Sequence, residues 1–368
     1  MPFCAARCGY CDFNTYTAAE LPGGGDRTGF VAAALQELDR AATTLGAAAR
    51  PAATVFFGGG TPTLLPPDDL LAILEGIRRR FGLEDRAEVT TEANPESVTS
   101  RALARLREGG FTRVSIGMQH AAPHVLRVLD RVHTPGRAAA AASEARAAGF
   151  EHVSVDLIYG TPGERAEDWA LTLDAALAAG PDHVSAYGLE IEPGTALAAR
   201  VRRGQLPPTD PDAMADRQAE ADAALSAAGL EWYEVANHAA SPRARCRHNL
   251  GYWKSHDWWG IGPGAHSHVA GERWWNVKHP TDWARRVAAG QSPAAGREAL
   301  DPAVRRFERI MLEVRLAEGL DLALLSPAGR RAAERLARDG TLELSGGRAV
   351  LTLRGRLTAD AVVRDLTD

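Results

Sequence analysis

The chain has 368 residues, with 42 lysines and arginines against 47 aspartates and glutamates, a formal net charge of −5 at pH 7. A balance this mild, without long blocks of one sign, argues against nucleic acid or a membrane surface as partner. The sequence contains no run of about eighteen apolar residues and no signal-peptide pattern, so we expect a cytoplasmic protein without stable membrane insertion.

Three of the four cysteines lie at the start of the chain, in C-A-A-R-C-G-Y-C (Cys4, Cys8, Cys11). Thiolates this close together can bind one soft metal centre, and sulfur ligands select zinc, copper(I) or iron–sulfur clusters. A four-iron, four-sulfur cube normally takes four cysteines, so a cube held by three leaves one iron open to a small molecule. The spacing favours this cluster over disulfides and over a structural zinc site completed by Cys246 or a histidine, because zinc ligands usually come as two close pairs.

Short apolar runs alternate with amphipathic stretches along the first 205 residues. Alternation of this kind implies a parallel sheet, and so many units predict an α/β fold built as a partial β/α barrel, with active residues at the carboxyl ends of the strands. The expected strands are 54–57, 88–91, 113–117, 152–159 and 183–189. The expected helices are 30–45, 68–81, 100–108, 137–148 and 166–179.

The alternation stops near Leu206. We expect a helix over 210–228 and a strand over 231–235, followed by an irregular stretch to about Trp283 that holds most of the histidines and tryptophans. Three parts are therefore expected: a barrel over residues 1–205, a His- and Trp-rich flanking segment over 206–295 and a C-terminal domain over 296–368.

The C-terminal part shows the pattern of a small winged-helix-type domain. A helix begins near Ala303, a second covers 330–339, a hairpin has Gly346 and Gly347 at its tip, and a last helix follows. Winged helices often bind DNA, but the charges here nearly balance, which argues against that function.

The C-x3-C-x2-C spacing resembles the radical S-adenosylmethionine (SAM) superfamily, in which the open iron binds the amino and carboxylate groups of SAM. Tyr10, just before the third cysteine, fits this pattern, and Asp12-Phe13-Asn14 narrows the resemblance to the HemW haem chaperones. The related oxygen-independent coproporphyrinogen III dehydrogenases carry a further cysteine where this chain has Phe13. The resemblance implies a 4Fe-4S cluster on the three cysteines, with SAM on its open iron.

The glycine run Gly58-Gly59-Gly60 directly follows the apolar run T-V-F-F. Consecutive glycines at a strand end let a ligand approach backbone N–H and C=O groups. The run resembles the family's G-G-G-T-P-T turn, which contacts the SAM amino group and so implies SAM contacts at Gly59, Gly60 and Thr61. The same resemblance places four polar residues on SAM-binding positions, of which the last three can also line a second SAM-like site: Glu92, Gln119, Arg131 and Asp156.

The segment rich in His and Trp contains H-N-x-x-Y-W, beginning at His248, which marks the same family, and the turn G-I-G-P-G-A-H-S follows it. Haem needs a broad aromatic wall and an axial ligand, for which histidine is the commonest choice. We therefore expect His248 to bind haem. Packing of the segment as a lid on the barrel is the alternative role, and Cys246 is an alternative soft ligand.

The resemblance implies a haem chaperone that binds haem and passes it to an acceptor protein, which the sequence does not identify. The alternatives are a coproporphyrinogen III dehydrogenase, which decarboxylates propionate side chains with a SAM-derived radical, and a zinc-stabilised binding module. Family members have a strand ahead of P-F-C, whereas this chain begins Met1-Pro2-Phe3-Cys4. We therefore expect the first barrel strand to be missing from the numbered chain and the true start to lie upstream.

Overall fold

The centre of the molecule is a seven-stranded sheet. The computed structural model describes residues 1–21, 27–131 and 134–367. The strand order of this sheet is β1-β2-β3-β4-β5-β7-β6. Strands β1 to β5 are parallel, whereas β7 runs antiparallel to both of its neighbours, β5 and β6. The strands are β1 (Ala52–Phe57), β2 (Leu83–Ala93), β3 (Arg113–Gln119), β4 (His152–Tyr159), β5 (His183–Gly188), β6 (Glu231–Glu234) and β7 (Asn237–Ala239). Among the described residues the edge strands β1 and β6 do not pair with each other, so the barrel is partial and the predicted fold class is confirmed.

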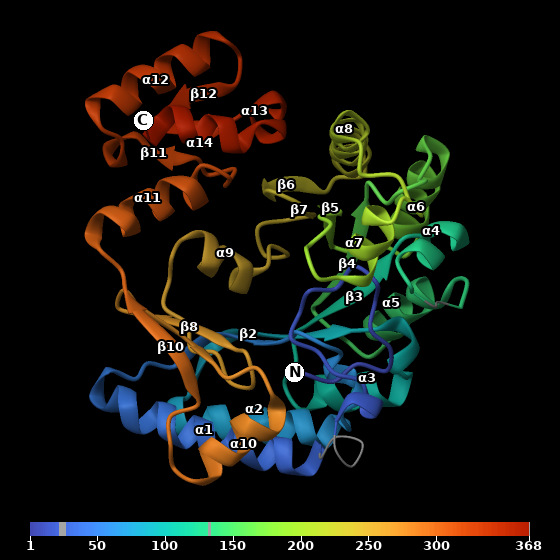
Figure 1. The fold of residues 1–368 in the computed structure, drawn as a ribbon, viewed down its shortest axis with the longest axis vertical. Coiled ribbons are helices and arrows are strands. Elements are labelled where there is room, and N and C mark those ends of the chain that lie inside the picture. The colour runs from blue at the N-terminus through green and yellow to red at the C-terminus, as the bar shows by residue number, and fades with distance from the viewer. Residues whose placement is uncertain (22–26, 132–133, 368) are drawn as a thin grey trace.

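Helices pack on the outer face of this sheet (Figure 1). They are α1 (Arg27–Leu45), α2 (Pro67–Phe81), α3 (Ser100–Glu108), α5 (Arg137–Ala147), α6 (Ala166–Ala178) and α8 (Pro211–Ala227). The short helices α4 (Pro123–Val128) and α7 (Ala196–Arg202) lie instead at the cysteine loop, where Gly9 N donates to Leu129 O and Leu197 N donates to Gly9 O. The amphipathic helix α2 buries Leu70 and Leu74 in one core with Val114 and Ile116 of β3. This packing leaves the inner face of the sheet, on which polar residues lie, to form the site.

The strand β2 begins earlier than the sequence predicts. It starts at Leu83 rather than at Glu88, and the extra residues include the charged, exposed Glu84, Asp85 and Arg86. Apolar periodicity does not detect a strand end that projects into solvent.

The prediction of an irregular stretch up to Trp283 is wrong. The stretch contains β7, the helix α9 (Arg247–Trp253), the strands β8 (His266–Val269) and β9 (Glu272–Asn276), and the start of α10 (Pro280–Ala288). With β10 (Ala294–Ala299), β8 and β9 form a second, antiparallel sheet in the order β10-β9-β8. Consecutive tryptophans in β9 put large apolar side chains on both faces, which hides the period of two that marks a strand.

The C-terminal unit has its own buried core. It consists of α11 (Pro302–Glu313), β11 (Leu320–Asp321), α12 (Pro327–Arg338), β12 (Leu342–Ser345), β13 (Arg348–Leu351), α13 (Leu353–Leu357) and α14 (Ala359–Thr367). Its sheet has the order β11-β13-β12, and the hairpin turns at Gly346 and Gly347, which both have positive φ. Two helices, a hairpin and a closing helical pair agree with the predicted winged-helix-like architecture, although α12 begins at Pro327 rather than Arg330.

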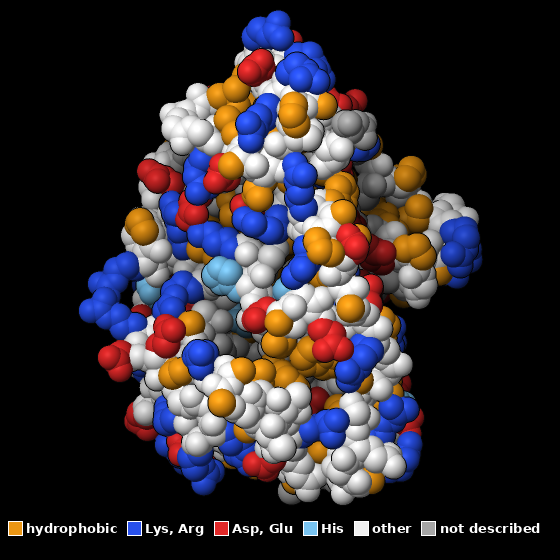
Figure 2. All heavy atoms as spheres, turned by 90° about the vertical axis from the view of Figure 1, so that its left-hand side faces the viewer, with side chains coloured by type: hydrophobic (Ala, Val, Ile, Leu, Met, Phe, Trp, Pro, Cys, Tyr) orange, Lys and Arg blue, Asp and Glu red, His pale blue; other side chains and the backbone are white. Residues whose placement is uncertain are grey.

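The outer surface shows no block of one charge on the face drawn in Figure 2, where basic and acidic side chains are interspersed. Histidine side chains reach that surface at mid-height, below the C-terminal unit. Among the described residues no helix is long and apolar enough to cross a membrane. The domain boundaries at residues 205 and 295 stay predictions; β6 and β7, which lie beyond the first boundary, extend the barrel sheet.

Candidate cofactor and ligand site

The cysteine loop lies against the glycine turn that follows β1. The N–H of Gly60 donates to Met1 O at 2.7 Å and that of Thr61 donates to Phe3 O at 2.7 Å. A Cβ added at Gly60 would lie 2.5 Å from Phe3 O, so only glycine permits this approach. Because these bonds form at the carboxyl end of β1, the loop is held at the mouth of the partial barrel.

The three cysteines are partly buried and free of disulfides. Burial raises the pKa of the Cys4 and Cys11 thiols, and Arg131 Nη1 donates to Cys8 Sγ at 3.4 Å. Partly buried thiols beside a guanidinium fit a soft, anionic iron–sulfur centre, because metal and cation together favour the thiolate form. Within the described ranges no three His, Cys, Asp or Glu side chains converge on one metal ion, whereas in a cube each thiolate binds a different iron.

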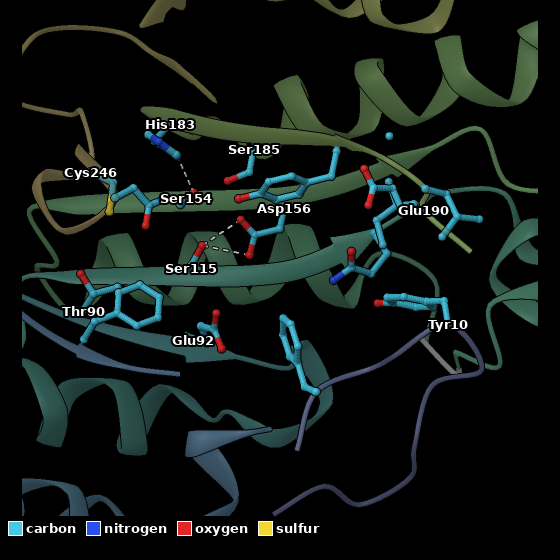
Figure 3. A pocket seen from close by; sticks show the side chains of 18 of the residues that line it. Tyr10, Thr90, Glu92, Ser115, Ser154, Asp156, His183, Ser185, Glu190 and Cys246 are labelled. Carbon is cyan, nitrogen blue, oxygen red and sulfur yellow. Dashed lines mark hydrogen bonds between the residues drawn. The ribbon is translucent and has the colours of Figure 1, made fainter. Parts of the chain in front are cut away.

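A cavity of about 520 Å³ lies inside the partial barrel, next to the cysteine loop. Its wall includes four predicted site residues: Tyr10, Glu92, Gln119 and Asp156. Figure 3 shows the side chains of Glu92, Ser115 and Asp156 projecting from adjacent strands into the same space, with Tyr10 at the other end. The structure therefore brings together residues that lie far apart in the sequence.

Two more predicted residues join this wall through contacts. The N–H of Gly59 donates to Glu92 Oε2 at 3.0 Å, and Arg131 Nη2 donates to Gly117 O at 2.8 Å. Thr61 lies at the cysteine loop, with its Oγ1 3.9 Å from Cys4 Sγ. The glycine turn, the cysteines and the polar strand ends thus form one continuous site.

Two partly buried carboxyl groups give the cavity its electrostatic character. Burial, with the negative charge of Asp156 adding to it, raises the pKa of Glu92 to about 7. Burial also raises the pKa of Asp156, although Ser185 and Ser115 oppose the shift by hydrogen bonding, with Ser115 Oγ 2.9 Å from both carboxylate oxygens. A positively charged ligand relieves both shifts, so the cavity is suited to a cation such as a sulfonium or an ammonium group.

Further residues that the motifs did not predict line the cavity near Cys246, where Arg113 Nε donates to Glu88 at 3.3 Å. Opposite them, His183 bonds Ser154 Oγ through Nδ1 at 2.7 Å and Tyr233 OH through Nε2 at 2.8 Å. The sequence does contain a pattern that could have identified these residues. Polar residues two positions apart occur in four successive strands, and residues at that spacing face the same side of a sheet. The pairs are Thr90 and Glu92, Arg113 and Ser115, Ser154 and Asp156, and His183 and Ser185.

His248 lies outside the cavity, on α9, but adjoins it through one ring. Its imidazole stacks on Phe56, with ring centroids 5.0 Å apart, and Phe56 lines the cavity. Glu88 fixes the start of the helix by accepting the N–H groups of Arg247 at 3.1 Å and His248 at 3.0 Å. Burial lowers the pKa of His248 to about 4, so the imidazole is neutral near pH 7, the form in which histidine ligates metals.

An aromatic wall continues from His248 as expected for the segment. Tyr252 contacts Trp258 with ring centroids 4.9 Å apart, and Trp258 contacts His268 at 5.2 Å. Cys246 is a poor alternative ligand, because burial raises the pKa of its thiol to about 12. His120, next to Gln119, is buried and bonds Thr172 at 3.1 Å, so it packs in the core beside the site.

Comparison with known proteins agrees with these features. Residues 1–176 match the family model of the radical SAM superfamily, and residues 300–358 match that of the HemN C-terminal domain. The heme chaperone HemW of Mycobacterium tuberculosis (strain ATCC 25618 / H37Rv) is 54% identical over 366 residues, which cover 100% of this chain and 93% of the relative. The heme chaperone HemW of Escherichia coli (strain K12) is 36% identical over 271 residues, covering 73% of this chain and 68% of the relative.

Among solved structures, coproporphyrinogen III oxidase (HemN) from Escherichia coli, a radical SAM enzyme, aligns with a TM-score of 0.82. The match covers 100% of this chain and 88% of the other at 22% identity, which shows a common fold. The shared fold alone does not distinguish the HemW family from HemN, whereas sequence identity along the whole chain does. The chain belongs to the HemW family.

Proposed function

We propose that this protein is a haem chaperone, which binds haem through His248 and transfers it to an acceptor protein. The proposal also assigns a 4Fe-4S cluster to Cys4, Cys8 and Cys11, with exchangeable SAM at its open iron. The observation that carries it is the position of His248, a neutral imidazole at the edge of an aromatic wall. Similarity along the whole chain to proteins named heme chaperone HemW supports the same function.

Different residues of the chain would serve the cluster, SAM and haem. The cluster, when bound, supplies an open iron to which SAM coordinates. Glu92 and Asp156 would bind positive charge on SAM, a backbone C=O group of the glycine turn would accept a hydrogen bond from its amino group, and Arg131 would offset negative charge at the cysteines. On the outer side of Phe56, the wall of Tyr252 and Trp258 would shield one face of the haem from water.

A radical enzyme that decarboxylates a porphyrinogen is the second candidate. The cavity of about 520 Å³ beside the cysteine loop favours it, because a substrate bound there would lie next to the proposed cluster and SAM. The cysteine triplet and the SAM residues serve both candidates, so only binding and turnover separate them.

The test is anaerobic reconstitution followed by two parallel assays, haem titration by the Soret band and coproporphyrinogen turnover. The chaperone predicts about four irons per chain, saturable haem binding and no turnover. His248→Ala should weaken haem binding or shift the Soret band, while a variant lacking all three cysteines should lose iron yet still bind haem. Turnover by the wild type without saturable haem binding would reverse the choice of function.

His256→Ala is the matched control, because His256 is an exposed histidine of the same segment. It should leave the haem spectrum unchanged. If His256→Ala, and not His248→Ala, altered the Soret band, the ligand assignment would be wrong. A Cys8→Ser variant with normal iron content would contradict the cluster assignment.

A further inference from the structure

Both ring nitrogens of His248 already have hydrogen-bond partners. Nδ1 lies 2.8 Å from Thr54 Oγ1 on the partly buried side of the ring, and Nε2 lies 2.9 Å from Tyr252 OH on the exposed side. Tyr252 itself is 41% exposed, so Nε2 is the nitrogen that a ligand arriving from solvent meets. An iron atom therefore has to take the place of the tyrosine hydroxyl.

The two partners have different consequences for ligation. An imidazole that binds iron through Nε2 carries its remaining proton on Nδ1, and a hydrogen-bond acceptor there fixes both the tautomer and the ring orientation. Thr54 Oγ1 is placed to accept that proton. In the same tautomer Nε2 accepts the hydroxyl proton of Tyr252, so this bond occupies the lone pair that iron needs.

The opposite face of the imidazole leads back to the cavity. Phe56 stacks on His248 at an interplanar angle of 17° and also lines the cavity. A Cβ added at Gly58 would lie 2.4 Å from Phe56 Cε1 and 3.0 Å from Glu92 Oε2, so the phenyl ring, the glycine turn and the carboxylate are in close contact. A single aromatic ring therefore separates the proposed SAM residues from the proposed haem ligand.

We propose that Tyr252 is a latch that blocks Nε2 of His248, and that Phe56 couples this latch to the SAM site. A ligand that settles on the glycine turn and Glu92 displaces Phe56, and the stacked imidazole moves with it. A displaced imidazole loses its bond to Tyr252 OH and presents Nε2 to iron, so SAM increases haem affinity. The inference rests on the proposed function, because it takes His248 as the haem ligand, and it adds the regulation of that site.

The first experiment removes the two partners of His248 separately, with isosteric changes, and measures haem affinity by Soret titration. Tyr252→Phe keeps the ring against Trp258 but frees Nε2, so haem should bind several-fold more tightly, with the spectrum of a histidine ligand. Thr54→Val removes the acceptor at Nδ1 and should weaken haem binding several-fold. Equal weakening by both changes, or weaker binding in Tyr252→Phe, would show that the tyrosine helps to hold haem and would overturn the latch.

The second experiment measures the haem dissociation constant of reconstituted protein with and without SAM. The wild type should bind haem at least about fivefold more tightly with SAM, and haem should tighten SAM binding by the same factor, since coupling is reciprocal. In Tyr252→Phe this ratio should approach one because the latch is already open. In Phe56→Leu it should also approach one because the stacked ring is gone.

Two controls separate this inference from the proposed function. The SAM-induced change in the electron paramagnetic resonance spectrum of the reduced cluster must persist in Phe56→Leu, which shows that the variant still binds SAM. If the wild type binds haem through His248 but with a SAM ratio of one, the coupling is wrong and the chaperone stands. If His248→Ala binds haem like the wild type, the ligand assignment itself is wrong.

Discussion

At the scale of single residues, two partly buried carboxyl groups, those of Glu92 and Asp156, line one cavity. Desolvation raises the pKa of both groups, and the negative charge of Asp156 raises the pKa of Glu92 further. The positive charge of Arg131 opposes the shift of Asp156, but its guanidinium also donates to Cys8 Sγ and to Gly117 O. A cationic ligand is therefore the natural complement of this pair, and its binding should depend on pH.

Glu92→Gln tests this dependence. With a pKa of about 7, Glu92 is protonated in much of the population at neutral pH, so the affinity for SAM should rise as pH rises through 7 and level off above it. In Glu92→Gln the affinity should be lower and flat over this range. Calorimetric titration of reconstituted protein at several pH values measures both, and an unchanged pH dependence in the variant would assign the titration to another group.

The raised pKa of Glu92 also makes the stability of the protein without ligand depend on pH. Between the unfolded pKa near 4.5 and the folded value of about 7, the native protein keeps a proton that the unfolded chain releases. The contribution of Glu92 to the free energy of unfolding is therefore greatest below pH 4.5 and falls as pH rises through 7. In Glu92→Gln this contribution to the change of the free energy of unfolding with pH should disappear.

At the scale of elements, the cysteine loop is tied to the turn that precedes β8 and to the segment that follows β9. Asn14 Nδ2 donates to Pro263 O at 3.2 Å and to Lys278 O at 2.8 Å. Within that turn, Gly262 N donates to the buried Glu37 at 2.8 Å, which anchors it to α1. The turn therefore supports the cysteine loop.

Gly264→Ala should loosen this support. Gly264 has φ +70°, and a Cβ there would lie 2.7 Å from Asn14 Nδ2, so alanine adds a clash to the backbone strain. Gly290→Ala is a matched control, because Gly290 also has φ +70° but nothing within 4 Å of the added Cβ. Both variants should lose about 1 kcal/mol of stability from strain, but only Gly264→Ala should release iron faster to a chelator. Equal iron release would mean that the turn does not support the loop.

Helices and strands whose apolar residues recur at a regular spacing could be predicted from the sequence. Elements composed mainly of aromatic or polar residues could not. Helices such as α3 and α6 follow apolar spacing to within one residue of their ends. The strand β9 is missed because its consecutive tryptophans lie on both faces, and β8 is missed because it has only four residues, most of them polar. Of the site, the motifs identify the cysteines and Glu92, whereas the hydrogen bond between Thr54 and His248 joins residues 194 positions apart, which no local pattern reveals.

At the scale of the whole molecule, the C-terminal unit is fixed to the barrel beside the proposed haem segment. Ala317 N donates to Tyr233 O at 2.9 Å, and Lys254, at the end of α9, pairs with Glu318 at 2.7 Å. Arg356 of α13 donates to Asp222 of α8 at 2.6 Å and covers the ring of Trp232 at 4.3 Å. The unit therefore restrains both α9 and the last strands of the sheet.

Arg356→Met should weaken this attachment. Although burial opposes it, hydrogen bonding to His238 and Arg356 lowers the pKa of Asp222, and the Arg356 side chain is only 8% exposed. Removing the guanidinium leaves a partly buried carboxylate with one partner fewer, so the free energy of unfolding should fall by about 1–3 kcal/mol. Because a lowered pKa stabilises the fold only above the unfolded value of 3.8, the loss of stability in Arg356→Met should shrink as pH falls below it.

Arg364→Met, an exposed change on α14, is the control and should cost less than about 0.5 kcal/mol in the same denaturation assay. Equal losses in the two variants, or a deficit that persists at low pH, would show that the ion pair does not hold the C-terminal unit to the barrel.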